Sequence, residues 1–239
     1  ALIYLDSNKS FKSSRPIEFI DGEYVKKIPF GQGEIIIRLL SFIEGKFIGE
    51  TSASEQITIS LGLLLAKLNL KLQSWDNYII KSRESEWNLN SYLISKQYID
   101  QIDHYSDRKL VKYFFQQYEL EVVPHNQKLR KSIIHNDANE WNLLVENNSV
   151  YGIIDFGDIS YSDQINELAV AIVYNSYTKS NYLYWAEKLI ASYNSINPLE
   201  EIEIKLLYYK IALRLCVSAC NSAKAKHIDL AFAELQALT

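Results

Sequence analysis

Three oxygen-bearing side chains are spaced along one stretch of the chain so that they could act together. Asp137 is followed five residues later by Asn142, and Asp155 comes thirteen residues after Asn142. A carboxylate can orient a hydroxyl group and accept its proton, and amide and carboxylate oxygens are ligands that suit Mg²⁺. A metal bound there would offset the charge of a phosphoryl group during its transfer. The trio therefore indicates phosphoryl-transfer chemistry.

The residues between these side chains have the composition of a β-hairpin. Residues 143–145 and 150–154 are short apolar runs, and the Glu-Asn-Asn-Ser segment between them has the composition of a turn. A hairpin here returns the chain to its starting point, which places Asp155 beside Asn142. Asp137 lies within the reach of one loop of Asn142. We expect all three side chains to converge at one end of the hairpin.

The wording of this stretch resembles that of a known superfamily. His135-x-Asp137-x4-Asn142, followed by Ile-Asp-Phe-Gly-Asp at residues 154–158, is similar to the motifs of the aminoglycoside phosphotransferase and choline kinase superfamily. Within it, the resemblance is closest to hydroxylysine kinase-like proteins, and it runs from about residue 15 to about residue 225. Three further stretches carry it, namely residues 37–45, 61–68 and 167–171.

The resemblance implies an α+β architecture, the protein kinase-like two-lobe fold. Residues 1–45 would form a partial, strand-rich N-terminal lobe with the hinge, and residues 46–239 a mostly helical C-terminal lobe. The nucleotide would bind in the cleft between the lobes.

The same resemblance assigns roles to individual residues. It implies that Asp137 is the catalytic base and that Asn142 and Asp155 bind the metal. The adenine edge would meet the backbone of the hinge, at Ser41, Phe42 and Ile43.

Three further residues are expected to support the site. The ring of His135 would fix the loop. Asp158 would either approach a metal-bound water or the substrate amine, or cap the next segment. Glu167 would brace the catalytic loop from below, as an acidic residue often does in relatives, or else be a solvated helix residue.

These expectations describe a Mg²⁺-dependent kinase that transfers the γ-phosphate of ATP or GTP to a hydroxyl of an amino alcohol, hydroxylysine-like. Choline, ethanolamine and aminoglycosides are alternative acceptors, and a kinase-like binding module without turnover is the alternative from another functional class. The resemblance implies a cationic acceptor. An acidic balance is compatible with this, and it comprises Asp155, Asp158, Asp163 and Glu167.

Composition narrows the range of partners. The chain has 239 residues, of which 48% are apolar, and a formal net charge of −4. It has no block of Lys and Arg, which disfavours a nucleic-acid partner, and no apolar run of bilayer-spanning length, so no membrane partner is expected. Cys216 and Cys220 lie four residues apart in a helical pattern, which favours buried free thiols and a cytoplasmic compartment.

Hydrophobic periodicity predicts the remaining elements. Strands are expected at 24–28 and 34–42, joined by a turn within 29–33, and helices at 57–72, 110–122, 163–176, 181–194 and from 197 to about 225. Apolar spacing predicts that one face of the second helix is formed by Leu110, Phe114, Tyr118 and Val122. Ser162 or Asp163 would cap the third helix, and Asn197 and Pro198 would open the last one.

The beginning of the sequence suggests a longer natural polypeptide. Ala1 to Leu5 resembles the end of a helix, methionine is absent, and two strands are too few for a sheet that covers a nucleotide. We expect an N-terminal extension that carries a phosphate-covering loop and a lysine.

Overall fold

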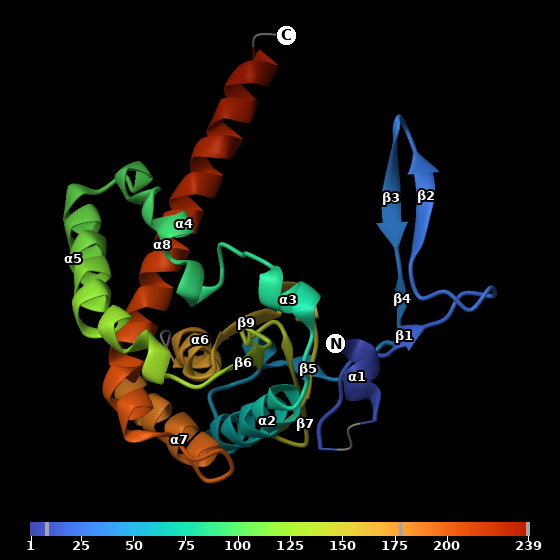
Figure 1. Cartoon of the computed structure of the whole chain (residues 1–239), viewed down its shortest axis with the longest axis horizontal. Coiled ribbons are helices and arrows are strands. Elements are labelled where there is room, and N and C mark those ends of the chain that lie inside the picture. Colours follow the sequence, from blue (N-terminus) through green and yellow to red (C-terminus); the bar gives the residue numbers. More distant parts are fainter. Residues whose placement is uncertain (8–9, 177–178, 238–239) are drawn as a thin grey trace.

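The computed structural model describes residues 1–7, 10–176 and 179–237. After a short helix, α1 (Leu2–Asp6), the chain forms two small antiparallel pairs. β1 (Pro16–Ile17) pairs with β4 (Leu39–Leu40), and β2 (Lys26–Phe30) forms a hairpin with β3 (Gly33–Ile37). This hairpin stands away from the rest of the molecule (Figure 1).

The β2–β3 turn confirms the predicted hairpin but is tighter than expected. Phe30 pairs with Gly33, so only two residues make the turn, and Gly31 has a φ of 60°. A turn of this kind requires positive φ, which glycine adopts without a steric penalty.

Two further sheets carry the candidate site. β5 (Lys46–Phe47), β7 (Leu143–Glu146) and β8 (Ser149–Ile153) form a three-stranded antiparallel sheet with β7 in the centre. β6 (Lys131–Ile134) pairs with β9 (Ser160–Asp163). β7 and β8 are the hairpin that the sequence predicts, and Leu143 pairs with Ile153 at its open end.

Helices make up the rest of the molecule. The long ones are α2 (Glu55–Gln73), α5 (Tyr105–Glu121), α6 (Ile165–Ser176), α7 (Tyr182–Asn194) and α8 (Glu201–Ala237). Between α2 and α5 lie the short helices α3 (Tyr78–Ser82) and α4 (Leu93–Lys96). Short 3₁₀ helices are η1 (Ile48–Glu50), η2 (Leu89–Ser91), η3 (Ile99–Gln101), η4 (Val123–Lys128) and η5 (Phe156–Asp158).

Two apolar clusters hold these elements together. One joins α2, α6 and α7 to the β7–β8 hairpin, and its fully buried members include Leu65, Leu68 and Leu168. The other lies between α5 and α8 and includes Phe115 and Val217. α8 contributes to both clusters and crosses most of the molecule (Figure 1). No helix within the described residues is long and apolar enough to cross a membrane.

The predicted face of the 110–122 helix was right at Tyr118 and Val122 but wrong by one position in the first half of the helix. Leu110 is exposed, while Val111 and Phe115 are buried with Tyr118 and Val122. Apolar residues are adjacent at 110–111 and 113–115, so the sequence admits two helical phases, and contact with α8 selects the second.

Two predicted helix starts were also wrong. Residues 160–163 form the strand β9, so Asp163 ends a strand and α6 begins at Ile165. α8 begins at Glu201 instead of Pro198, because the backbone N–H of Glu200 donates to the carboxylate of Glu203 and forms a capping contact there.

Candidate active site

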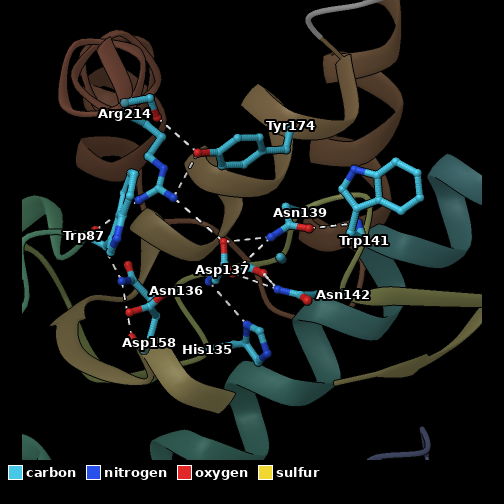
Figure 2. A network of polar contacts seen from close by, with 12 residues as sticks. Trp87, His135, Asn136, Asp137, Asn139, Trp141, Asn142, Asp158, Tyr174 and Arg214 are labelled. Carbon is cyan, nitrogen blue, oxygen red and sulfur yellow. Dashed lines mark hydrogen bonds and ion pairs between the residues drawn. The ribbon is translucent and has the colours of Figure 1, made fainter. Parts of the chain in front are cut away.

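The loop after β6 brings the predicted residues together. Asn136 takes a left-handed backbone conformation, with a φ of 69°, which turns the chain sharply before Asp137. Its side-chain Nδ2 donates to the carbonyl oxygens of Trp87 at 3.3 Å and Asp158 at 3.4 Å. These two bonds tie the loop to two separate segments and hold the turn (Figure 2).

His135 is fully buried beneath this loop. Its Nδ1 accepts from the backbone N–H of Asp137 at 3.2 Å, so its Nε2 carries the proton and donates to the carbonyl of Ile154 at 2.9 Å. Burial lowers the pKa of this imidazole to about 4, which keeps the ring neutral at physiological pH. Its edge-to-face contact with Phe156 adds a further restraint. These contacts support the predicted structural role.

Asp137 stands at the centre of the polar network in Figure 2. Asn139 Nδ2 donates to both carboxylate oxygens at 3.0 Å, and Asn142 Nδ2 donates to Oδ2 at 2.7 Å. The Arg214 guanidinium lies 3.9 Å from Oδ1. Burial raises the pKa of Asp137, while Asn139, Arg214 and Asn142 act in the opposite direction.

The hairpin places Asn142 and Asp155 at its open end. The backbone N–H of Ile154 donates to the carbonyl of Asn142 at 2.9 Å, which closes the open end of β7 and β8. Asp155 has a left-handed backbone, with a φ of 58°, and its Oδ1 accepts from the N–H of Gly157 at 3.0 Å. Its side chain is otherwise directed away from the packed core, because the residue is exposed.

Asn142 and Asp155 each present an oxygen that could serve as a metal ligand. Asn142 Oδ1 has no hydrogen-bond partner among the described residues, and one oxygen of Asp155 is likewise left for a ligand. No cluster of three or more His, Cys, Asp or Glu suited to a metal occurs in the described parts of the chain. A pair of oxygen ligands of this kind suits Mg²⁺, which commonly retains waters and binds substrate phosphates.

Glu167 lies beneath the loop, fully buried. Its Oε2 accepts from the backbone N–H of His135 at 2.6 Å and from that of Asn136 at 3.3 Å, and Oε1 is buried without a partner in the described structure. Burial raises the pKa of this carboxyl to about 7. The bracing contact agrees with the first of the two expectations for this residue, and the solvated alternative is wrong.

Asp158 contacts the catalytic loop through its backbone carbonyl. Its carbonyl accepts from Asn136 Nδ2 and from Ser160 Oγ. Its half-buried carboxyl has a pKa raised by burial and by the nearby Asp137. The charges that act on this carboxyl are those of Asp137, Asp155, Arg83 and Arg214. A role of the Asp158 carboxyl toward a ligand stays a prediction.

The expected hinge lines a cavity. The backbone N–H of Ser41 donates to the carbonyl of Arg15, and the backbone N–H of Arg15 donates to Ser41 Oγ, both at 2.8 Å. Ser41, Phe42 and Ile43 border a cavity of about 460 Å³ together with residues of the N-terminal segment, Glu146 and Tyr151. Phe42 is largely exposed at this point.

A second cavity lies beside the catalytic loop, on the side of α6 and α7. It measures about 450 Å³, and its walls include Glu140, Trp141, Tyr174, Lys179 and Trp185. Trp141 is 54% exposed, and its ring makes an edge-to-face contact with Phe47.

Several site residues were not anticipated. The most important is Arg214, whose contact with Asp137 joins segments far apart in the sequence. One signal was present: Lys210 and Arg214 recur in phase with the buried Leu206, Leu213 and Val217, so cations occupy the inward face of an apolar helix. Lys210 meets Asp163 at 2.6 Å, and Lys131 meets it at 2.5 Å.

The ion pairs of Asp163 reduce the number of acidic residues that could face a cationic acceptor, contrary to the expectation. Burial opposes ionisation of Asp163, but Lys210 and Lys131 together hold its pKa below the usual value. Asp163 is therefore neutralised inside the protein, and Glu167 is committed to the loop backbone. Neither carboxylate is available to a cationic acceptor.

A known protein family and several known proteins match this chain. The sequence profile of the phosphotransferase enzyme family matches residues 6–198. A hydroxylysine kinase of Danio rerio is 30% identical over 197 residues, which cover 79% of this chain and 56% of that protein. The chain spans little more than half the length of the hydroxylysine kinases it matches.

Solved structures show the same fold. A microcompartment-associated aminopropanol kinase superposes with a TM-score of 0.75 at 18% identity, covering 93% of this chain and 74% of that one. An amicoumacin kinase in complex with AMP-PNP, Ca²⁺ and Ami gives a TM-score of 0.72 at 16% identity, covering 93% of this chain and 68% of that one. The expected kinase-like α+β fold is confirmed.

Proposed function

Because the chain belongs to the phosphotransferase enzyme family, we propose that it acts as a kinase of a small hydroxyl compound. The observation that supports this most directly is the convergence of Asp137, Asn142 and Asp155 at one end of the β7–β8 hairpin. The proposed division places the N-terminal lobe and hinge at residues 1–45 and the C-terminal lobe at residues 46–239.

In the proposed reaction, Asp137 orients the acceptor hydroxyl and receives its proton. The acceptor oxygen forms a new bond to the γ-phosphorus, the bond from that phosphorus to the bridging oxygen breaks, and the nucleoside diphosphate leaves. Asn142 Oδ1 and Asp155 would hold Mg²⁺, which would offset the charge of the nucleotide phosphates. ATP or GTP would be the donor, with its base at the backbone of residues 41–43.

The cavity beside the catalytic loop supports an acceptor with a charged amine. Trp141, Trp185 and Tyr174 offer aromatic faces, which attract ammonium groups. Glu140 has one buried carboxylate oxygen without a partner in the described structure. Lys179 lies 4.6 Å from the Trp185 ring centroid and offers a cation to an acceptor carboxylate. The combination suits an amino acid with a hydroxylated, amine-bearing side chain, hydroxylysine-like.

The two cysteines support a cytoplasmic location. Cys216 and Cys220 are both free and buried on α8. Free thiols in this pattern are typical of reducing compartments.

The test is a coupled nucleotide-consumption assay on the full-length protein with Mg²⁺ and either ATP or GTP. Acceptors would be hydroxylysine, ethanolamine, choline and an aminoglycoside, each compared with an uncharged isostere. We expect acceptor-dependent turnover that favours the charged compound. Consumption that no acceptor stimulates would favour a binding module instead.

The matched control is Asp137→Asn. This change keeps the shape of the side chain but removes the proton acceptor, so kcat should fall by about 10²–10⁴. Nucleotide affinity, measured by calorimetry, should change little. Turnover near the wild-type level would show that Asp137 is not the base.

A further inference from the structure

Arg214 is a buried arginine for which the proposed mechanism has so far no use. It projects from α8 toward the catalytic loop and is only 2% exposed. Nη1 donates to the carbonyl of Trp87 at 3.1 Å, and Nη2 donates to the hydroxyl of Tyr174 at 3.1 Å. The guanidinium also lies 4.8 Å from the Trp87 ring centroid and 5.1 Å from that of Tyr174.

These contacts give the guanidinium a single position. Two rings limit its movement on either side, and two hydrogen bonds fix its rotation, so Nη2 stays directed at Asp137 Oδ1, 3.9 Å away (Figure 2). A planar, permanently charged fork is suited to such a site, because less conformational freedom is lost for each bond it makes.

The surroundings of Asp137 explain what this charge does there. Asp137 lies close to the carboxyl groups of Asp155, Asp158 and Glu167, and burial disfavours its ionised form. Arg83 reaches the Asp158 side of the cluster, where it donates to the carbonyl of Gly157. His135 is neutral, so Arg214 is the cation that lies nearest to Asp137 among the described residues.

We propose that Arg214 is a positioning residue for Asp137: its fixed guanidinium keeps the carboxylate turned toward the acceptor hydroxyl. The inference rests on the proposed kinase function and assigns part of its machinery to α8. Asn139 and Asn142 direct the two oxygens through neutral donors, and Arg214 supplies the charge that those amides lack.

Direct binding of an acceptor anion by Arg214 is disfavoured by its burial. Both terminal nitrogens already donate to protein oxygens, and the remaining Nε is buried without a partner in the described structure. A ligand therefore meets Tyr174 at the cavity wall before it reaches the guanidinium.

The separate effects of substitutions on kcat and KM test the proposal. Arg214→Gln removes the charged group that faces Asp137 Oδ1, so kcat should fall by about 10–10²-fold while KM for nucleotide and acceptor changes little. Arg214→Lys should restore part of the wild-type kcat. Tyr174→Phe removes only the hydroxyl that accepts from Nη2 and should lower kcat by less.

Arg130→Gln is the matched control. Arg130 pairs with the buried Glu203 near the start of α8, so its loss also leaves a buried partner, but it contacts no residue of the loop. Its kcat and KM should equal those of the wild type. A wild-type kcat in Arg214→Gln would overturn the proposal, as would an equal loss of kcat in Arg130→Gln or a KM increase confined to acceptors that carry a carboxylate.

A second readout does not depend on turnover. The free energies of unfolding of Arg214→Gln, Asp137→Asn and the double variant form a cycle, measured in urea at pH 8. We expect non-additive effects, because the two side chains interact. Additive effects would remove the contact on which the proposal depends. If the cycle shows coupling but no acceptor is phosphorylated, the kinase function fails while the contact stands.

Discussion

Asn142 uses the two ends of its amide for different purposes. Nδ2 donates inward to the carbonyl and carboxylate of Asp137, while Oδ1 has no protein partner in the described structure. One side chain thus links the proposed base to the proposed metal. An aspartate at this position would lose the donor, and an alanine would lose both functions.

This division leads to a prediction about magnesium. In Asn142→Ala and Asp155→Ala, the Mg²⁺ concentration for half-maximal activity should rise by at least about tenfold, because each change removes a hard oxygen ligand. Asn139→Ala is the control, since Asn139 also bonds to Asp137 but is no proposed ligand. An unchanged Mg²⁺ requirement in both ligand variants would refute the assignment.

The raised pKa of Glu167 predicts that the stability of the folded protein depends on pH. Its pKa is raised by burial to about 7, so the folded state holds the proton more tightly than the unfolded chain. Its stabilising contribution is therefore complete below the unfolded pKa near 4.5 and is lost as the pH rises through about 7. Glu167→Gln removes this dependence while an amide oxygen can still accept from His135 and Asn136.

The measurement is the melting temperature of both proteins between pH 4.5 and 8. The variant should gain on the wild type as the pH rises through this window, and the gap should be constant above it. Parallel curves across the whole window would contradict the raised pKa.

At the scale of elements, α2 and α7 pack closely where α2 has a glycine. A Cβ atom at Gly62 would lie 2.0 Å from Ser192 Oγ, 2.6 Å from the Leu189 carbonyl oxygen and 2.9 Å from the Tyr193 nitrogen. Two of these neighbours are backbone atoms of α7, which a rotamer change cannot move. The absence of a side chain at Gly62 therefore fixes the approach of the two helices.

Gly62→Ala should destabilise the fold by about 1–3 kcal/mol or more, because the helices must separate. The free energy of unfolding in urea measures it. Adding Ser192→Ala should restore part of the loss only, since the Leu189 carbonyl remains. Full recovery in the double variant would show that the serine side chain, not the backbone, limits the approach.

The sequence pattern predicted an element correctly where it was compatible with only one arrangement. The β7–β8 hairpin followed from two apolar runs around a turn, and this register alone places Asp155 next to Asn142. It failed where two solutions compete, as in the helix at 110–122, whose phase is decided by contact with α8. The contacts of Arg214 with Trp87, Asp137 and Tyr174 were beyond reach for the same reason, because sequence spacing does not encode contacts between distant helices.

For the whole molecule, burial is unevenly distributed. The two apolar clusters lie in the helical part and around the β7–β8 hairpin, whereas the β2–β3 hairpin has large exposed side chains such as Phe30 (69%) and Ile36 (67%). Two strands without a packed face have little stability of their own. Local opening should therefore differ strongly between these two hairpins.

Hydrogen exchange of the 239-residue chain tests this difference. Amides of β2 and β3 should exchange orders of magnitude faster than those of β7 and β8, because only the latter pair is covered by α2. The two hairpins serve as controls for each other within one experiment. Equal protection would mean that the β2–β3 hairpin is covered in solution, for example by self-association.

The position of Arg214 on α8 has a consequence for how the protein is made. A ribosome synthesises the chain from its N-terminus, so the loop with Asp137 leaves the ribosome well before the turn of α8 that carries Arg214. Until that helix docks between α5 and α6, no guanidinium lies beside the carboxylate. A nascent chain thus contains all residues of the phosphotransfer motif before a cation lies beside the carboxylate of Asp137, the proposed base.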